Sequence, residues 1–252
     1  MLPVERRQKI LNLVKKRGVV SINDLVSLLG VSHMTVRRDL EKLEREGLVI
    51  SVSGGVQISR KLSYEPSHLA KAEMAAEEKK RIGRAASALI PENVCIYMDA
   101  GTTSLALANF IAERAGLTIV TNDFAVLSFL ADKGDNILIH AGGLLRPQNR
   151  SSVGMLAART LESLSFDIAF LSASSWDSRG ITTPDIDKVT VKQAVMRSSR
   201  QKILICDSTK YGQVATYVAF KLEELDMVIT DRALPAAAVG ILEGKGVEVR
   251  LV

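Results

Sequence analysis

The sequence has few of the residues that build disulfide frameworks and metal sites. Its 252 residues include only two cysteines, Cys95 and Cys206, and three histidines. Both cysteines lie in apolar, strand-like runs, so we expect two reduced core thiols and no disulfide. The histidines, His33, His68 and His140, are too scattered to indicate a zinc site. We therefore expect neither a metal ion nor a cofactor.

Long apolar runs and a dinucleotide-binding glycine motif are also missing. No run approaches the ~18 residues that span a bilayer, and the N-terminal charges precede no hydrophobic signal segment. We therefore expect a cytoplasmic protein with no membrane partner. No Gly-x-Gly-x-x-Gly follows a predicted strand, which argues against a nicotinamide-dependent enzyme. With 47% hydrophobic residues, the chain can hold a small head plus a larger core of ~175 residues.

Basic residues outnumber acidic residues only in the N-terminal quarter of the chain. Residues 1–61 carry 12 Lys or Arg against 6 Asp or Glu, whereas the remainder carries 21 against 22. The phosphate backbone dominates affinity for nucleic acid, so a basic segment on a nearly neutral body indicates a DNA-binding head. For the basic residues alone, a solvated helix face is the alternative interpretation.

The run from Val31 to Leu40 has the pattern of a DNA recognition helix, which we expect to extend from about residue 32 to 46. Ser32 can cap it, and Val36, Leu40 and Leu43 then fall on one buried face. The opposite face presents two adjacent guanidinium groups, which suit phosphates and guanine edges. The predicted DNA-contacting residues are Ser32, His33, Thr35, Arg37 and Arg38.

The flanking segments complete a winged helix. Apolar periodicity predicts a helix over 3–17, and a capping-box-like start at Ser21 predicts another over about 22–29. Alternation on either side of Ser53-Gly54-Gly55 predicts a β-hairpin. We assign residues 1–60 to this head. We assign residues 61–76 to a linker, because this segment has no regular apolar pattern and contains Pro66 but no clear strand.

Residues 77–252 have the pattern of a mostly parallel α/β domain. After a helix predicted over about 75–90, short apolar runs alternate with helical segments. Continuous apolar runs separated by helices are typical of a parallel sheet covered on both faces. The predicted strands are Cys95 to Met98, Leu117 to Val120, Ile137 to Ile139, Ile168 to Leu171, Ile203 to Cys206, Met227 to Ile229 and Val247 to Leu251.

Five polar loops follow directly on these predicted strands. In a parallel sheet such loops share one edge, where ligands bind. Residues 99–104 also lead into a helix, so their hydroxyls and the helix N–H groups can form a phosphate cradle. Gly and Thr also cap helices for purely structural reasons, but five loops on one edge favour a pocket. The predicted ligand-binding residues are Asp99, Gly101, Thr102, Thr103, Ser104, Thr121, Asn122, Gly142, Gly143, Ser174, Lys192, Asp207 and Lys210.

Two of these residues can supply the positive charge that a phosphate requires. Lys210 follows a predicted strand, and Lys192 lies in the helix after Pro184. Either can equally be a solvated lysine. Asp99 would repel a phosphate, so we expect it to accept loop N–H groups or sugar hydroxyls.

Over nearly its full length the sequence resembles the DeoR-type (DeoR/GlpR) bacterial transcriptional regulators. The resemblance implies a winged-helix repressor of a carbohydrate-utilisation operon, whose sensor domain is similar in fold to sugar-phosphate isomerases. It also implies a phosphorylated sugar or related metabolite as effector, double-stranded operator DNA as partner, and a homo-oligomer, either dimer or tetramer. The residues that carry it are Glu5 to Ile10, Val31 to Leu40, Asp99 to Thr103, Thr121-Asn122, Gly142-Gly143, Gly180 to Thr183, Lys192 and Asp207 to Lys210.

One loop departs from the family pattern. After the strand at 168–171 the family often has a turn with glycine and aspartate, whereas this chain has Ser172-Ala173-Ser174-Ser175-Trp176-Asp177. Trp176, the single tryptophan, either contacts the non-phosphate part of the ligand or packs in the core.

A sugar-phosphate isomerase fused to a DNA-binding head is the alternative function. Lys and Asp near a phosphate site are the minimum for proton transfer beside a carbonyl. We find no acid–base pair beyond Asp99, Asp207 and the lysines, each of which has a binding role. We therefore predict a sensor and not an enzyme, with no catalytic residues.

Overall fold

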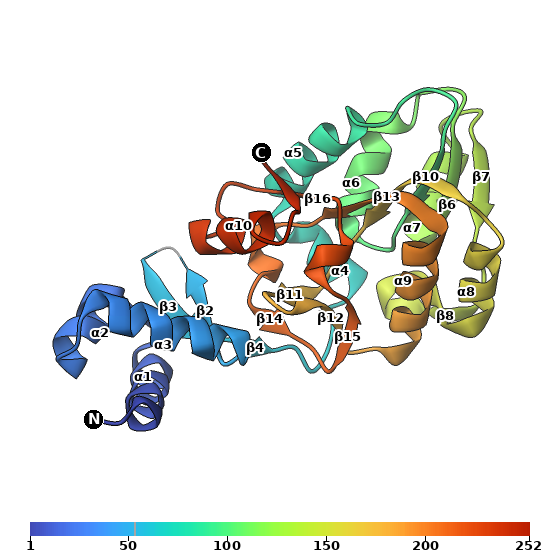
Figure 1. The fold of residues 1–252 in the computed structure, drawn as a ribbon. Coiled ribbons are helices and arrows are strands. Elements are labelled where there is room, and N and C mark those ends of the chain that lie inside the picture. Colours follow the sequence, from blue (N-terminus) through green and yellow to red (C-terminus); the bar gives the residue numbers. More distant parts are fainter. Residues whose placement is uncertain (53) are drawn as a thin grey trace.

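The computed structural model describes residues 1–52 and 54–252, which form a small head and a larger domain (Figure 1). In the head, α1 (Pro3–Arg17) and α2 (Ile22–Leu29) begin and end where the sequence predicted, and α3 (His33–Arg45) is the predicted recognition helix. The predicted hairpin is present as β2 (Val49–Val52) and β3 (Gly55–Ile58), and β1 (Val19–Val20) adds a third antiparallel strand. Ser53, in the predicted turn, lies outside the described residues.

Local signals set the course of the chain through the head. The hydroxyl of Ser32 accepts the N–H of Thr35 (3.2 Å) and caps α3. Gly30 adopts the left-handed conformation (φ 65°) that the turn between α2 and α3 requires. The predicted face of α3 is buried in a core shared by the head helices and the hairpin, whose members are Ile10, Val14, Val20, Leu25, Leu29, Val36, Leu40, Leu43, Val49 and Val56.

A buried ion pair joins the first and third helices of the head. Asp39 is 3% exposed and accepts a hydrogen bond from the Arg6 guanidinium, while Arg7 lies 3.6 Å from its other oxygen. Because both arginines come from α1, Asp39 fixes how α3 lies on that helix. The sequence analysis did not single out this residue.

The connecting segment is more structured than the predicted linker. The sequence analysis found no clear strand there, but β4 (Arg60–Lys61) pairs in parallel with β14 (Gln213–Val214). Helix α4 (His68–Glu73) follows, and then α5 (Ala76–Ser87), which occupies the predicted 75–90 helix. The boundaries at 60/61 and 76/77 stay predictions.

The larger domain is built on a seven-stranded parallel sheet that contains all seven predicted strands. Chain order runs outward from β5 to β7 on one side and from β5 through β10 to β17 on the other, which is the doubly wound arrangement. In spatial order the strands are β17 (Glu248–Leu251), β16 (Met227–Thr230), β13 (Ser199–Ile205), β10 (Phe166–Leu171), β5 (Cys95–Met98), β6 (Thr118–Thr121) and β7 (Ile137–His140).

Helices cover both faces of this sheet, as the continuous apolar strands require. Successive residues of a strand point to opposite faces, so Ile96 and Met98 pack on one side and Tyr97 on the other. The first face carries α5, α6 (Thr102–Ile111) and α7 (Phe124–Ala131). The second carries α8 (Gly154–Glu162), α9 (Ile186–Ser198) and α10 (Ala236–Glu243).

Small sheets and turns that the sequence analysis did not predict extend the second face. A three-stranded antiparallel sheet joins β11 (Ser175–Asp177), β12 (Gly180–Thr183) and β15 (Tyr217–Phe220), and β8 (Leu144–Arg146) pairs with β9 (Ser151–Val153). Trp176 on β11 is fully buried and packs edge-on against Tyr211, so it is a core residue. The short 3-10 turns are η1 (Pro147–Asn149), η2 (Ser208–Lys210) and η3 (Leu222–Glu224).

The head packs directly on the larger domain. Ile50 of β2 is buried in the second-face core. The Ser59 hydroxyl donates to the carbonyl of Gly212 (3.3 Å), and that of Ser178 donates to the carbonyl of Glu44 (3.4 Å). Both cysteines are free, and none of the described helices has the length and apolar character to cross a membrane.

Asp39 provides a test of how the head is held together. Replacing it with Ala removes the shared partner of two arginines, and we expect the head to lose about 1–3 kcal/mol of stability. Hydrogen exchange of the full chain should become faster in α1 and α3 and stay unchanged in the large sheet. Glu41→Ala removes an exposed carboxylate from the same helix and should have little effect. Unchanged exchange in Asp39→Ala would show that the pair does not hold the helices.

Candidate functional site

The exposed face of α3 is the candidate DNA interface. Of the residues predicted to contact DNA, Ser32, His33, Arg37 and Arg38 are exposed. Thr35 is half-buried, because its hydroxyl lies 3.0 Å from that of Ser32 in the cap. The structure thus leaves both adjacent arginines free to reach a ligand, while the opposite face of the helix is locked into the head core.

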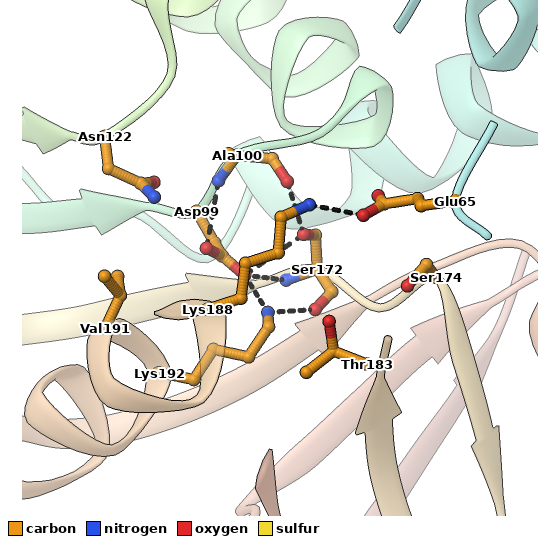
Figure 2. A pocket seen from close by; sticks show the side chains of 10 residues that line it. All are labelled: Glu65, Asp99, Ala100, Asn122, Ser172, Ser174, Thr183, Lys188, Val191 and Lys192. Atoms are coloured by element: carbon orange, nitrogen blue, oxygen red, sulfur yellow. Dashed lines mark hydrogen bonds and ion pairs between the residues drawn. The ribbon is translucent and has the colours of Figure 1, made fainter. Parts of the chain in front are cut away.

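A second candidate site lies at the carboxyl edge of the parallel sheet. Strand order reverses between β5 and β10, and loops that leave such neighbouring strands in opposite directions open a crevice for ligands. A small cavity, the switch-point cavity, occupies this place (Figure 2). It is lined by Glu65, Asp99, Ala100, Asn122, Ser172, Ser174, Thr183, Lys188, Val191 and Lys192.

Asp99, directly after β5, is the centre of the hydrogen bonds in this cavity. One carboxylate oxygen accepts the backbone N–H and the hydroxyl of Ser172, both at 3.0 Å. The other accepts the N–H of Ala100 at 3.0 Å. The carboxylate therefore ties the loop after β5 to the loop after β10 across the point where strand order reverses.

Lys192 of α9 neutralises Asp99. Its ammonium donates to the carboxylate and also to the carbonyl of Ser172 (2.6 Å), and both charged side chains are buried. A lysine with these two partners neutralises the carboxylate and is not a free cation for a phosphate. Figure 2 shows Lys188 one helical turn earlier on the same face of α9.

Asn122 follows β6 and contributes an amide to the cavity wall. Its oxygen accepts from the hydroxyl of Tyr97 (2.9 Å) and its NH₂ donates to the carbonyl of Ser152 (2.9 Å). Thr121, just before it, donates its hydroxyl to the carbonyl of Met98 (2.7 Å) and so connects two strands. Among the residues predicted for this site, Asp99, Asn122, Ser174 and Lys192 line the cavity.

The predicted phosphate cradle lies beside this cavity, at the start of α6. Gly101 donates its N–H to the Asp123 carboxylate (2.9 Å), and Thr102 to Ser104 form the first helical turn. Thr103 and Ser104 are buried, and the Ser104 hydroxyl has no hydrogen-bond partner among the described residues. This turn has N–H groups without intrahelical acceptors, but it does not line the cavity.

The remaining predicted residues lie along the same edge but outside the cavity wall. Lys210 and Asp207 are both buried, with 3.6 Å between their charged atoms. Gly142 and Gly143 follow β7; Gly143 has φ 106°, and a side chain there would meet Val153 and Ala157. Gly143 thus allows close packing of the chain, whereas Gly142 adopts a left-handed turn conformation (φ 63°) with open space around it.

The cavity also contains residues that the sequence analysis missed. Lys188 could have been found, because it lies four residues before Lys192 and so shares its helix face. Thr183 ends the Gly180–Thr183 run but was not assigned to the site. Glu65 carried no such signal, since it comes from the segment predicted to be a linker.

Glu65 is a buried carboxylate held by donors from three elements. It accepts from Lys71 (2.6 Å), from Lys188 and from the side-chain amide of Asn149 (3.3 Å). Burial opposes its charge, but the two lysines prevail and lower its pKa to about 2. It is therefore ionised across the physiological pH range.

The pKa of Asp123 is raised, whereas that of Glu65 is lowered. It caps α7 by accepting the N–H groups of Ala125 (2.6 Å) and Val126 (3.1 Å). Burial raises its pKa to about 6, against the effect of these hydrogen bonds and that from Gly101.

Comparison with known proteins identifies both parts of the chain. A model of the DeoR-like helix-turn-helix domain matches residues 6–61, and one of the DeoR C-terminal sensor domain matches residues 74–232. YgbI of Escherichia coli (strain K12), named as an uncharacterized HTH-type transcriptional regulator, is 52% identical over 94% of this chain and 93% of its own length. The glycerol-3-phosphate regulon repressor of the same strain is 32% identical over the full length of both chains.

Solved structures match only weakly. The sorbitol operon regulator SorC of Klebsiella pneumoniae has a TM-score of 0.35 at 11% identity, over 86% of this chain and 97% of that one. Ribose 5-phosphate isomerase A of Methanocaldococcus jannaschii has a TM-score of 0.38 at 16% identity, over 54% and 55%. At these scores neither bears on the function.

The raised pKa of Asp123 predicts a pH-dependent stability. The Asp123 carboxyl has a pKa of about 6 in the folded protein and near 3.8 in the unfolded chain. Protonation of Asp123 therefore stabilises the folded state. This contribution is full below about pH 4 and is lost as the pH rises through 6. Two pKa units correspond to about 3 kcal/mol. The difference in unfolding free energy between wild type and Asp123→Asn should therefore fall by about 2–3 kcal/mol between pH 4 and 7.

Asp132→Asn, at the exposed C-terminal end of α7, is the matched control and should leave the pH profile unchanged. A difference between wild type and Asp123→Asn that is constant with pH would contradict the raised pKa.

Proposed function

The chain belongs to the DeoR family of transcriptional regulators, and from that premise we propose that it represses a carbohydrate-utilisation operon under the control of a phosphorylated sugar or sugar-acid effector. As a member of that family it is a regulator and not an enzyme. In the proposal, α3 enters the major groove of the operator and the effector binds at the edge of the sheet where β5 and β10 diverge.

The observation that carries the DNA-binding part is the orientation of α3. Its apolar face and Asp39 are buried in the head, which leaves Arg37 and Arg38 exposed. Figure 1 shows α3 lying beside the β2–β3 hairpin, which is the wing of the winged helix. The head also holds the basic excess of the chain, with 12 Lys or Arg against 6 Asp or Glu in residues 1–61. Both features support a helix that meets phosphates and base edges.

The chemistry of the cavity supports a small polyol as the effector. Amide, hydroxyl and carboxylate groups line it, and such groups hydrogen-bond sugar hydroxyls. The relative named for the glycerol-3-phosphate regulon supports a phosphorylated compound. We keep the first turn of α6 and Lys210 as candidate phosphate contacts, because they flank the cavity along the same edge.

We further propose that the protein acts in the cytoplasm as a dimer or tetramer. One head buries too little DNA surface for strong specificity, so paired half-sites are expected. Four apolar side chains are exposed on β8 and at the start of α8, two elements that lie next to each other, and they support this proposal: Leu144, Leu145, Met155 and Leu156. Such side chains are candidates for contacts between subunits.

The double variant Arg37→Ala/Arg38→Ala tests the proposed DNA interface. With an operator fragment selected by the wild-type protein, affinity should fall by ~1–3 kcal/mol for each base or phosphate that these arginines bind, and the salt dependence should become shallower. Arg200→Ala is the control, because that side chain is 83% exposed on the large domain. Wild-type affinity in the double variant, measured by gel shift at several salt concentrations, would rule out α3 as the interface.

A further inference from the structure

Glu65 occupies a place where a ligand's acidic group would be expected. Its carboxylate lies in the wall of the switch-point cavity and is bound by Lys71 of α4, Lys188 of α9 and Asn149 of η1. Figure 2 shows Glu65 and Lys188 pointing toward one another beside Asp99 and Ser172. Two ammonium groups and an amide around one carboxylate are the donors that also bind free carboxylates and phosphates.

With Glu65 in this place the cavity is too small for a sugar. The space in which the centre of a water molecule fits is about 20 Å³, which is room for about one water. Pockets that enclose small organic ligands have volumes of roughly 300–1,000 Å³. A lining side chain must therefore move before a polyol can bind. Asp99 and Lys192 are tied to both strand-end loops, whereas Glu65 comes from the segment outside the sheet.

We propose that Lys71, Lys188 and Asn149 form an anion subsite, and that the acidic group of the effector binds there by displacing Glu65. This inference rests on the proposed function, which places the effector in this cavity. It places the effector's charged group on Lys71, Lys188 and Asn149 instead of on the first turn of α6 and Lys210, and it identifies Glu65 as the side chain that competes with that group.

The charge balance sets the class of ligand. Removing Glu65 leaves two largely buried lysines without their carboxylate, and an unpaired buried charge costs several kcal/mol. A neutral polyol cannot compensate them, whereas a carboxylate or phosphate can. The subsite therefore selects an organic anion, and either acid fits the same donors.

Displacement of Glu65 also acts on a segment that is bonded to the head. Glu65 lies four residues after β4, and β4 pairs with β14, where the N–H of Leu62 donates to the carbonyl of Val214 (2.7 Å). Strand β4 in turn follows wing strand β3 after one residue, Ser59. An effector that releases Glu65 thus loosens the segment that carries the wing, which links the cavity to DNA binding.

Calorimetric titration of full-length wild type and Glu65→Gln with inorganic phosphate, gluconate and sorbitol tests the proposal. The phosphate and carboxylate probes distinguish the two possible acids. At least one anion should bind Glu65→Gln at least tenfold more tightly than wild type, because the amide competes less well for the lysines. Sorbitol should bind neither. Glu73→Gln, an exposed carboxylate on α4, should match wild type.

Hydrogen exchange of the wild type provides a measurement that does not depend on the variant folding. Saturation with the bound anion should speed exchange in residues 62–73. An anion that binds Glu65→Gln equally or more weakly, or that slows exchange in this segment, overturns displacement of Glu65 and leaves the DNA-binding regulator intact. Binding of no anion by either protein overturns both this subsite and the proposed acidic effector.

Discussion

The buried ion pair between Asp99 and Lys192 is the interaction on which the rest of the site depends. It lies where the strand order of the sheet reverses, so its carboxylate can hold the loops after β5 and β10 at once. Separating Asp99 from Lys192 would leave a buried charge without a partner. The pair therefore resists movement of the two loops relative to α9. Pairing Lys192 with Asp99 also fixes the rotation of α9, and this rotation directs Lys188 into the cavity.

This arrangement separates rigid from displaceable parts of the cavity wall. Asn122 is hydrogen-bonded to Tyr97 of β5 and to Ser152 of β9, and α9 is bonded through Lys192 to the loop after β10. Among the described residues, the Glu65 carboxylate is bound by side chains alone, and Glu65 belongs to the segment that continues into β4 and the wing. A regulator needs a site that recognises its ligand and an element that moves when the ligand binds. In this cavity the sheet-edge loops and α9 meet the first requirement, and the segment that carries Glu65 meets the second.

The sequence was informative where local chemistry decides the structure. Continuous apolar runs predicted all seven strands of the sheet, and the Ser21 and Ser32 caps with Gly30 located the head helices. The pairing of distant charged residues could not be predicted: Lys192 and Asp99 were both assigned to the site, but they lie 93 residues apart and nothing in the sequence shows that they bind each other. Glu65 was missed for the same reason, since nothing in a proline-containing segment indicates that it returns to the sheet edge. The antiparallel strands β11 (Ser-Trp-Asp) and β12 (Gly-Ile-Thr-Thr) contain no continuous apolar run, which was the signal that identified the parallel strands.

In the proposed function, ligand binding in the switch-point cavity changes the affinity of α3 for operator DNA. Measuring the effect of ligand and operator on each other's binding is the sharpest test of this coupling. Among phosphorylated sugars and sugar acids, the compound with the largest thermal shift should be titrated against the protein with and without operator. We predict that it changes the operator Kd by ~5–150-fold, and that operator changes the ligand's Kd by the same factor. A compound that binds the protein tightly but leaves the operator Kd unchanged would contradict the coupling.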